Sequence, residues 1–260
     1  MSKPKVGVSM LYSLGEQFNR MVKHLKNIDT SYIEIVDDGA HELTPKRIKT
    51  LKETAKSYNL TYSLHAPFAD VNIASPIKSL LNASIKRVKQ SIEHANDLGA
   101  NLLVFHPGAL TGISQFYPGA QWKQNIASIQ EIYATAEDHG VNVAIENLPG
   151  KYWFLMNSPE QFSKFYRETN LPLGIVMDLG HAHLEGLIKP FFNQLADKIV
   201  HIHASDNDGT DDQHNGVGDG NIDYTWLSET LKKIRYDKSV IVESTKKVSE
   251  SIAKLRQLLD

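Results

Sequence analysis

The sequence contains no cysteine in its 260 residues, which excludes disulfide bonds, thiolate metal ligands and a cysteine nucleophile. Any metal ion would therefore be held by histidine, aspartate and glutamate side chains. Long apolar runs are also missing, so we expect no helix that crosses a membrane. The formal net charge of −2 is not that of a strongly basic nucleic-acid-binding protein.

Glycine-rich loops of the kind that bind nucleotide phosphates are absent as well. No dinucleotide-binding fingerprint follows the first apolar segment, and no P-loop pattern occurs in the chain. No apolar signal region precedes that first segment, so we expect a cytoplasmic protein. With 41% hydrophobic residues, the chain can bury a large core, which excludes intrinsic disorder.

Short apolar segments alternate with longer segments of helical periodicity along the whole chain. The clearest helix is 79–98, where apolar residues recur every three or four positions before Gly99. The segments that we predict as strands are Val6–Met10, Tyr32–Val36, Tyr62–His65, Leu102–His106, Val143–Glu146, Ile175–Asp178, Ile199–His203 and Val240–Glu243. This alternation predicts an α/β fold, a single (β/α)8 TIM barrel over residues 1–260.

The last six predicted strands share one feature, a histidine, aspartate or glutamate at the carboxyl end. These residues are His65, His106, Glu146, Asp178, His203 and Glu243. In a (β/α)8 barrel the carboxyl ends of the strands surround one mouth, where the active site lies. Several carboxylates cannot all ionise within a few ångströms of one another unless a cation compensates their charge. The pattern therefore predicts a divalent metal site built from imidazoles and carboxylates.

The motifs around these residues resemble those of the xylose isomerase-like barrel superfamily. This group includes endonuclease IV and the sugar-phosphate isomerases and epimerases. The resemblance covers nearly the whole chain. The motifs that carry it are His65-Ala-Pro, His106-Pro-Gly, Glu146-Asn, Asp178-Leu-Gly-His181, His203, Asp212-Gln-His214 and Glu243.

The resemblance implies between one and three bound metal ions. In endonuclease IV nine ligands hold three zinc ions, and all nine residue types are present here in the same order. The three implied groups are His65, His106 and Glu146, then Glu146, Asp178, His203 and Glu243, then His181, Asp212 and His214. In the isomerases and epimerases the second group alone usually holds one ion, for which we expect zinc, manganese, cobalt or magnesium.

Two reactions remain open. The first is isomerisation or epimerisation of a sugar, a sugar phosphate or a related hydroxy-carbonyl compound. In that reaction Glu146 and Glu243 would remove a proton from carbon and return it through an enediolate. The alternative is an endonuclease IV-like phosphodiesterase that cleaves DNA at abasic sites, where both glutamates would be ligands of a water-activating cluster. A non-catalytic metal-binding barrel is a third hypothesis.

Two features favour the first reaction. The motif Asp178-Leu-Gly-His181 lies where the endonucleases carry a cysteine-rich sequence, and it is more similar to the corresponding motif of the isomerases. Asp37-Asp38 and the aspartate-rich segment 204–221 predict an acidic rim, which opposes contact with a phosphate backbone. We therefore expect a small sugar as the partner more than duplex DNA. The oligomeric state is not indicated.

Other polar residues receive more ordinary interpretations. His201 lies on the same strand face as His203, and we expect it to be packed or to support a ligand rather than to be one. We expect His24, His41, His94 and His139 at the surface. Lys246 and Lys247 are expected on a solvated face, with a phosphate-binding role as the alternative.

Overall fold

A computed structural model of the chain, which describes residues 3–260, confirms the predicted closed barrel of parallel strands. The strands follow one another around the barrel in chain order, and β8 closes it by pairing with β1. Their bounds are β1 Lys5–Ser9, β2 Tyr32–Val36, β3 Thr61–His65, β4 Leu103–Phe105, β5 Val143–Glu146, β6 Gly174–Asp178, β7 Ile199–Ala204 and β8 Ser239–Val242. These bounds differ from the sequence prediction by one residue at some ends.

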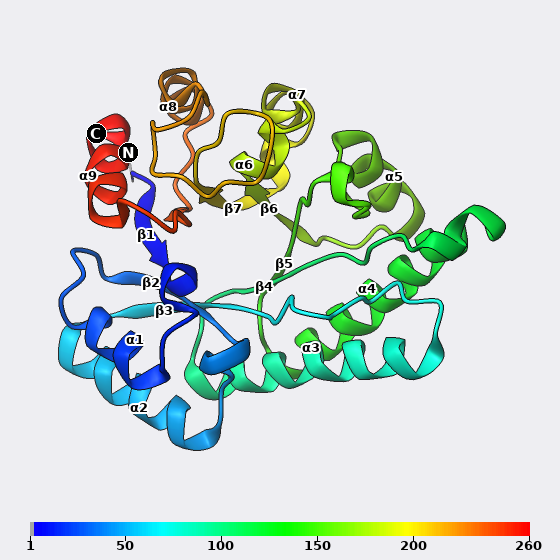
Figure 1. Cartoon of the computed structure of the whole chain (residues 1–260), viewed down its shortest axis with the longest axis horizontal. Coiled ribbons are helices and arrows are strands. Elements are labelled where there is room, and N and C mark those ends of the chain that lie inside the picture. The colour runs from blue at the N-terminus through cyan, green and yellow to red at the C-terminus, as the bar shows by residue number, and fades with distance from the viewer. Residues whose placement is uncertain (1–2) are drawn as a thin grey trace.

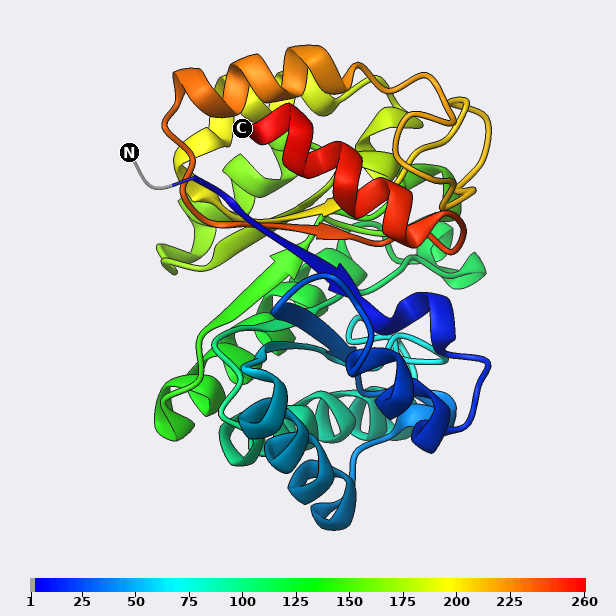
Figure 2. The same ribbon diagram turned by 90° about the vertical axis from the view of Figure 1, so that its left-hand side faces the viewer.

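The helices lie outside the ring of strands, as Figures 1 and 2 show. Their bounds are α1 Phe18–Leu25, α2 Pro45–Tyr58, α3 Lys78–Leu98, α4 Ala120–His139, α5 Pro159–Thr169, α6 Leu179–His183, α7 Ile188–Leu195, α8 Tyr224–Lys233 and α9 Val248–Leu259. The side chains of Thr44 and Ser158 cap the amino ends of α2 and α5, each followed by a proline. Gly99 and Gly140 end α3 and α4 in the left-handed conformation.

The main apolar core lies between the strands and the surrounding helices, and a second, small apolar cluster lies inside the barrel. This inner cluster consists of Val104, Ala144 and Val176. Each of them stands two positions before a polar residue at the end of β4, β5 or β6. Because side chains alternate along a strand, each apolar residue shares the inner face with the polar residue that follows it. Closure of the barrel therefore directs those polar side chains toward its axis.

The surface position expected for two histidines is wrong. His41 is fully buried, and its Nε2 atom lies 3.1 Å from the backbone oxygen of Glu16. His94 is 8% exposed and lies with its Nδ1 atom 3.0 Å from the carboxylate of Asp37. Polar partners offset the burial of both rings, and residue type alone does not reveal such partners.

Within residues 3–260, none of the helices combines the length and the apolar character needed to cross a membrane.

Gly7 lies in β1 where the barrel leaves no room for a side chain. A methyl group there would lie 2.5 Å from the carbonyl oxygen of Tyr32 and 2.6 Å from Cδ1 of Ile241. We expect Gly7→Ala to lower the free energy of unfolding by about 1–3 kcal/mol through overpacking. Urea denaturation would measure the change. Gly15→Ala is the matched control, because no atom lies within 4 Å of its added methyl group; equal stability of the two variants would contradict the expectation.

Candidate metal centre

The structure brings all nine sequence-predicted ligand residues together at the carboxyl end of the barrel. They come from strand ends, from the first turn after β6 and from the loop after β7. His65, Glu146, Asp178 and His203 belong to β3, β5, β6 and β7; His106 and Glu243 directly follow β4 and β8; His181 lies in α6; and Asp212 and His214 lie between β7 and α8.

Their ligand atoms form three of the four groups in which one nitrogen or oxygen atom of each residue lies within 4.8 Å of the others. These three groups are His65, His106 and Glu146, then Glu146, Asp178, His203 and Glu243, then His181, Asp212 and His214. Glu146 belongs to two of them. The division is the same as the one that the family resemblance implies.

The carboxylate of Glu146 lies at the centre of the cluster and is 1% exposed. Its Oε2 atom is 3.2 Å from Nε2 of His65 and 3.2 Å from Nε2 of His106. Its Oε1 atom is 3.2 Å from Nδ1 of His181 and 3.4 Å from Nδ1 of His203. One buried carboxylate thus contacts four imidazoles, an arrangement suited to a carboxylate shared between two cation positions.

Backbone carbonyl groups orient three of the histidines through Nδ1. The Nδ1 atom of His65 lies 2.7 Å from the oxygen of Ala66, and that of His214 lies 2.9 Å from the oxygen of Glu243. The Nδ1 atom of His181 lies 3.0 Å from the oxygen of Asn147. Because a carbonyl oxygen only accepts hydrogen bonds, each Nδ1 carries the proton, and Nε2 is the atom left for a metal ion.

Several buried atoms of the cluster lack a hydrogen-bond partner among the described residues. They are Oδ2 of Asp178, Nδ1 of His203 and Oδ1 of Asp212. Polar atoms buried without a partner cost free energy, so native proteins seldom leave them so. The donor set of imidazole nitrogens and carboxylate oxygens fits zinc, manganese or cobalt, and these free atoms are the ones that such a cation would engage.

Burial and the neighbouring charges shift the pKa values of several members of the cluster. Burial raises the pKa of Asp178 to about 7, and the carboxylates of Glu146 and Glu243 add to the increase against the effect of His181. Burial lowers the pKa of His65, but the hydrogen bond with Glu146 and the charges of the nearby glutamates together outweigh it, and the pKa is raised to about 9. Burial also lowers the pKa of His214, but its hydrogen bond with Asp212 and the charges of the neighbouring carboxylates together raise the pKa to about 9. Such shifts are typical of functional sites.

A cavity of about 170 Å³ opens onto the cluster. Its polar lining is formed by His65, His106, Glu146, His181, Asp212, His214 and Glu243, and its apolar walls by Phe68, Leu148, Pro149, Tyr152 and Phe154. No lysine or arginine occurs among these lining residues. A larger depression of about 690 Å³ lies at the amino ends of the strands, but its described lining contains none of the clustered ligands.

The acidic rim predicted at Asp37 and Asp38 is wrong for Asp37. Asp37 is fully buried and forms an ion pair with Arg87, at 3.0 Å between Oδ1 and Nη2. Asp38 is half-buried and accepts hydrogen bonds from the backbone N–H groups of Phe68 and Ala69, so it fixes the loop after β3. The charge of Asp37 is thus compensated by Arg87, whereas the partners of Asp38 are neutral.

Lys247 forms an ion pair with Asp219 at 2.9 Å, and both side chains are substantially exposed. The expectation of a solvated face is confirmed for this lysine.

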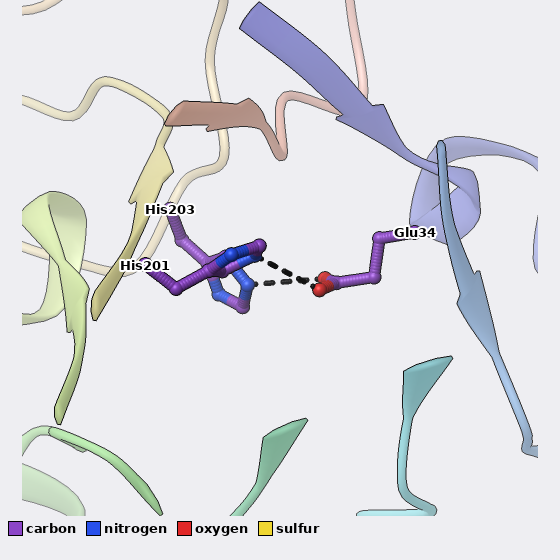
Figure 3. Close-up of side chains that lie close together, drawn as sticks. All are labelled: Glu34, His201 and His203. Carbon is purple, nitrogen blue, oxygen red and sulfur yellow. Dashed lines mark hydrogen bonds and ion pairs between the residues drawn. The ribbon is translucent and has the colours of Figure 1, made fainter. Parts of the chain in front are cut away.

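One buried acidic residue was not predicted from the sequence. Glu34 lies in the middle of β2 and is fully buried inside the barrel. Its carboxylate is 3.1 Å from Nε2 of His201 and 3.0 Å from Nε2 of His203, as Figure 3 shows. The available signal was a glutamate placed between apolar residues in the stretch Tyr-Ile-Glu-Ile-Val. The ligand atoms of Glu34, His201 and His203 also lie within 4.8 Å of one another, so these three residues form a fourth group that could hold a cation. That His201 supports a ligand rather than being one stays a prediction.

Comparison with known proteins agrees with this geometry. The family model for the xylose isomerase-like TIM barrel matches residues 22–258. A solved structure described as a D-tagatose 3-epimerase-like protein is 32% identical, with a TM-score of 0.89 over 98% of this chain and 95% of that chain. An uncharacterised protein of Methanocaldococcus jannaschii is 33% identical over 244 residues, which are 92% of this chain and 83% of that protein.

A further relative is a probable endonuclease 4 of Staphylococcus aureus. It is 27% identical over 194 residues, which are 68% of this chain and 64% of that protein. Similarity to the epimerase-like structure therefore extends over more of both chains than similarity to the endonuclease.

We expect metal binding to release protons and to strengthen as the pH rises. At pH 7 the Nε2 atoms of His65 and His214 hold protons in the metal-free protein, because both pKa values are about 9. A cation that binds through either histidine must displace its proton, and one held by the four-residue group must displace the proton of Asp178, whose pKa is about 7. The apparent affinity should therefore rise by up to about tenfold per pH unit for each proton released. Calorimetric titration with Mn²⁺ between pH 6 and pH 8, in buffers of different ionisation enthalpy, would count them. Binding without proton release would contradict the expectation.

Proposed function

The chain belongs to the xylose isomerase-like TIM barrel family, and from this premise we propose that it is a metal-dependent isomerase or epimerase of a sugar or related hydroxy-carbonyl compound. The observation that carries the proposal is the position of two carboxylates. Within the four-residue ligand group, Glu146 and Glu243 line the cavity, whereas Asp178 and His203 are not part of its lining. The similarity to an epimerase-like protein over nearly the whole chain supports the same activity.

All four residues of this group are buried, but only two of them line the cavity. Asp178 and His203 are fully buried, and Glu146 and Glu243 are 1% and 5% exposed. A divalent cation held by these four residues would polarise the carbonyl oxygen and the adjacent hydroxyl oxygen of a bound sugar. The two cavity-lining glutamates are then the groups of this set that reach a substrate carbon.

Glu146 and Glu243 would carry out the proton transfer. One carboxylate removes the proton from the carbon next to the carbonyl, and the electron pair of the C–H bond moves toward the carbonyl oxygen to give an enediolate. The other carboxyl group returns a proton to carbon, either on the opposite face, which gives the epimer, or at the neighbouring carbon, which gives the isomer. The first glutamate ends protonated and the second ionised, so exchange of a proton with water restores the starting state. In the isomerisation the hydroxyl proton also passes to the former carbonyl oxygen.

The walls of the cavity indicate the chemical class of the substrate. Phe68, Tyr152 and Phe154 supply aromatic surface, on which the C–H faces of a sugar pack. Since the lining contains neither lysine nor arginine, it offers no cation for a phosphate group. Lys247 is one of the two lysines for which the sequence offered a phosphate-binding role, and it is paired with Asp219. These features favour an uncharged sugar over a sugar phosphate.

The activity can be tested by solvent exchange at carbon. In D₂O with Mn²⁺ and a panel of ketoses and aldoses, we expect the protein to introduce deuterium next to the carbonyl of its substrate. Glu243→Gln should lower this rate about 10²–10⁴-fold, because an amide cannot accept the proton. NMR would measure exchange, and elemental analysis would verify that metal is still bound.

The exposed Glu250 in the first turn of α9 offers a matched control, Glu250→Gln, for which we expect the wild-type rate. Absence of exchange with every sugar in the panel would refute the proposal. An undiminished rate in metal-loaded Glu243→Gln would refute the role of that glutamate.

A second candidate function is cleavage of DNA at abasic sites. The observation that favours it is the third ligand group, His181, Asp212 and His214, which completes a nine-residue set. The relative described as a probable endonuclease 4 supports it over about two thirds of the chain. In that function Glu146 and Glu243 would serve as ligands of water-activating ions instead of moving protons to carbon.

An abasic-site oligonucleotide separates the two functions. We expect the zinc-loaded protein to leave the strand intact even at enzyme excess, because the cavity lining lacks the cationic side chains that hold a DNA backbone. Gel electrophoresis of an end-labelled duplex would detect a cut. Cleavage that disappears on chelation would establish the second function in place of the first.

A further inference from the structure

We propose that Glu34 is a positioning residue of the metal centre, which holds His203 so that its Nδ1 atom faces Glu146, Asp178 and Glu243. Glu34 lies on β2, a strand that supplies none of the nine ligand residues. The inference rests on the proposed metal-dependent function. It adds a residue that fixes the orientation of one ligand.

His203 is turned the opposite way from the three histidines held by backbone carbonyl groups. Those three direct Nδ1 at a backbone oxygen. In His203, by contrast, Nδ1 lies 3.1 Å from Oε2 of Glu243, 3.4 Å from Oε1 of Glu146 and 4.0 Å from Oδ2 of Asp178. A residue that fixes the ring of His203 must therefore contact Nε2, on the side away from the ligand group.

The carboxylate of Glu34 occupies that position. Its Oε1 atom lies 3.0 Å from Nε2 of His203, and Figure 3 shows the two side chains pointing toward each other across the barrel interior. The contact is a close ion pair, because neither atom meets hydrogen-bond geometry with any group in the part of the chain that the structure describes. Because a carboxylate only accepts, Nε2 carries the proton and Nδ1 keeps its lone pair toward the ligand group.

Glu34 is itself held in place by neighbours on the inner face of the barrel. Its Oε2 atom lies 3.1 Å from Oγ of Ser63 and 3.1 Å from Nε2 of His201, and Nδ1 of His201 lies 2.6 Å from Oγ of Ser239. Strand register explains the contacts, because Glu34 pairs with Ser63 between β2 and β3, and His201 pairs with Ser239 between β7 and β8. The carboxylate has little freedom to turn away from His203.

The charge of this support distinguishes His203 from the other ligands. The other three oriented histidines have neutral backbone oxygens behind them, whereas His203 has a carboxylate that is completely buried. A carboxylate behind a metal-binding imidazole fixes the ring and increases its basicity. The group of Glu146, Asp178, His203 and Glu243 is therefore the one that the protein prepares most strongly for a cation.

Replacement of Glu34 tests the proposal through metal binding and not through catalysis. We expect Glu34→Gln to lower the affinity for Mn²⁺ or Co²⁺ about 10–100-fold, the usual effect of removing such a support. The visible absorption spectrum of the Co²⁺-loaded protein should change as the ring of His203 loses its fixed orientation. Competition with a chromophoric chelator gives the affinity, and circular dichroism of the metal-free protein verifies folding.

Asp37→Asn is the matched control. Asp37 is another fully buried carboxylate, three residues after Glu34 in the sequence. Its partners are Arg87, Ser91 and His94 on α3. Its loss disturbs a buried ion pair without touching His203, so the metal affinity should stay within about twofold of wild type. An equal loss of affinity in the two variants would mean a general effect of destabilisation and would overturn the proposal.

Ser63→Ala provides a second variant that keeps the charge of Glu34. It removes one hydrogen bond to Oε2, and we expect a loss of affinity of about fivefold, in the same direction as in Glu34→Gln. Wild-type affinity in every folded variant of this pair would overturn the proposal.

A second readout is the ¹⁵N spectrum of the zinc-loaded protein labelled at histidine. Zinc on Nδ1 and a proton on Nε2 of His203 support the proposal, and the reverse arrangement overturns it.

These outcomes are separate from the fate of the proposed function. A protein that binds the cation through His203 Nδ1 and yet exchanges no sugar proton would refute the epimerase proposal and leave the role of Glu34 intact. Conversely, epimerisation of a sugar by the wild-type protein, together with undiminished metal affinity in Glu34→Gln, would support the epimerase proposal and refute the role of Glu34.

Discussion

The mutual compensation of buried carboxylates and imidazoles is the interaction on which this structure depends. Glu34, Glu146 and Asp178 are almost completely removed from water inside a barrel that also holds the apolar side chains of Val104, Ala144 and Val176. A lone carboxylate would be strongly disfavoured there, so its position is tenable only beside imidazoles or a cation. Glu146 has four imidazoles around it, and Glu34 has two.

Barrel closure makes this compensation achievable. Each strand from β3 to β8 brings one polar side chain to the same end, and the alternation of side chains directs it inward. The backbone then assists, because carbonyl groups of the loops accept the Nδ1 protons of His65, His181 and His214 and orient their rings. The geometry of the centre thus follows from main-chain positions as much as from the ligand residues.

The same arrangement connects the site to its chemistry. Asp178 and His203 stay behind the cavity, whereas Glu146 and Glu243 line it beside aromatic walls. This separation suits a centre in which some ligands only hold a cation and others also exchange protons with a substrate. The third group around Asp212 extends the centre toward the loop after β7.

The sequence by itself determined the strand order, the barrel and the residue types at the strand ends, because hydrophobic periodicity and barrel closure are local rules that repeat along the chain. It also identified all nine clustered residues. Only the tertiary structure decided which buried charges are partners. Glu34 and His203 are far apart in sequence, Asp37 is neutralised by Arg87 from α3, and His41 and His94 are buried beside partners that their own segments do not reveal. The physical reason is that burial of a polar group depends on a partner from another element, and a linear pattern does not contain that pairing.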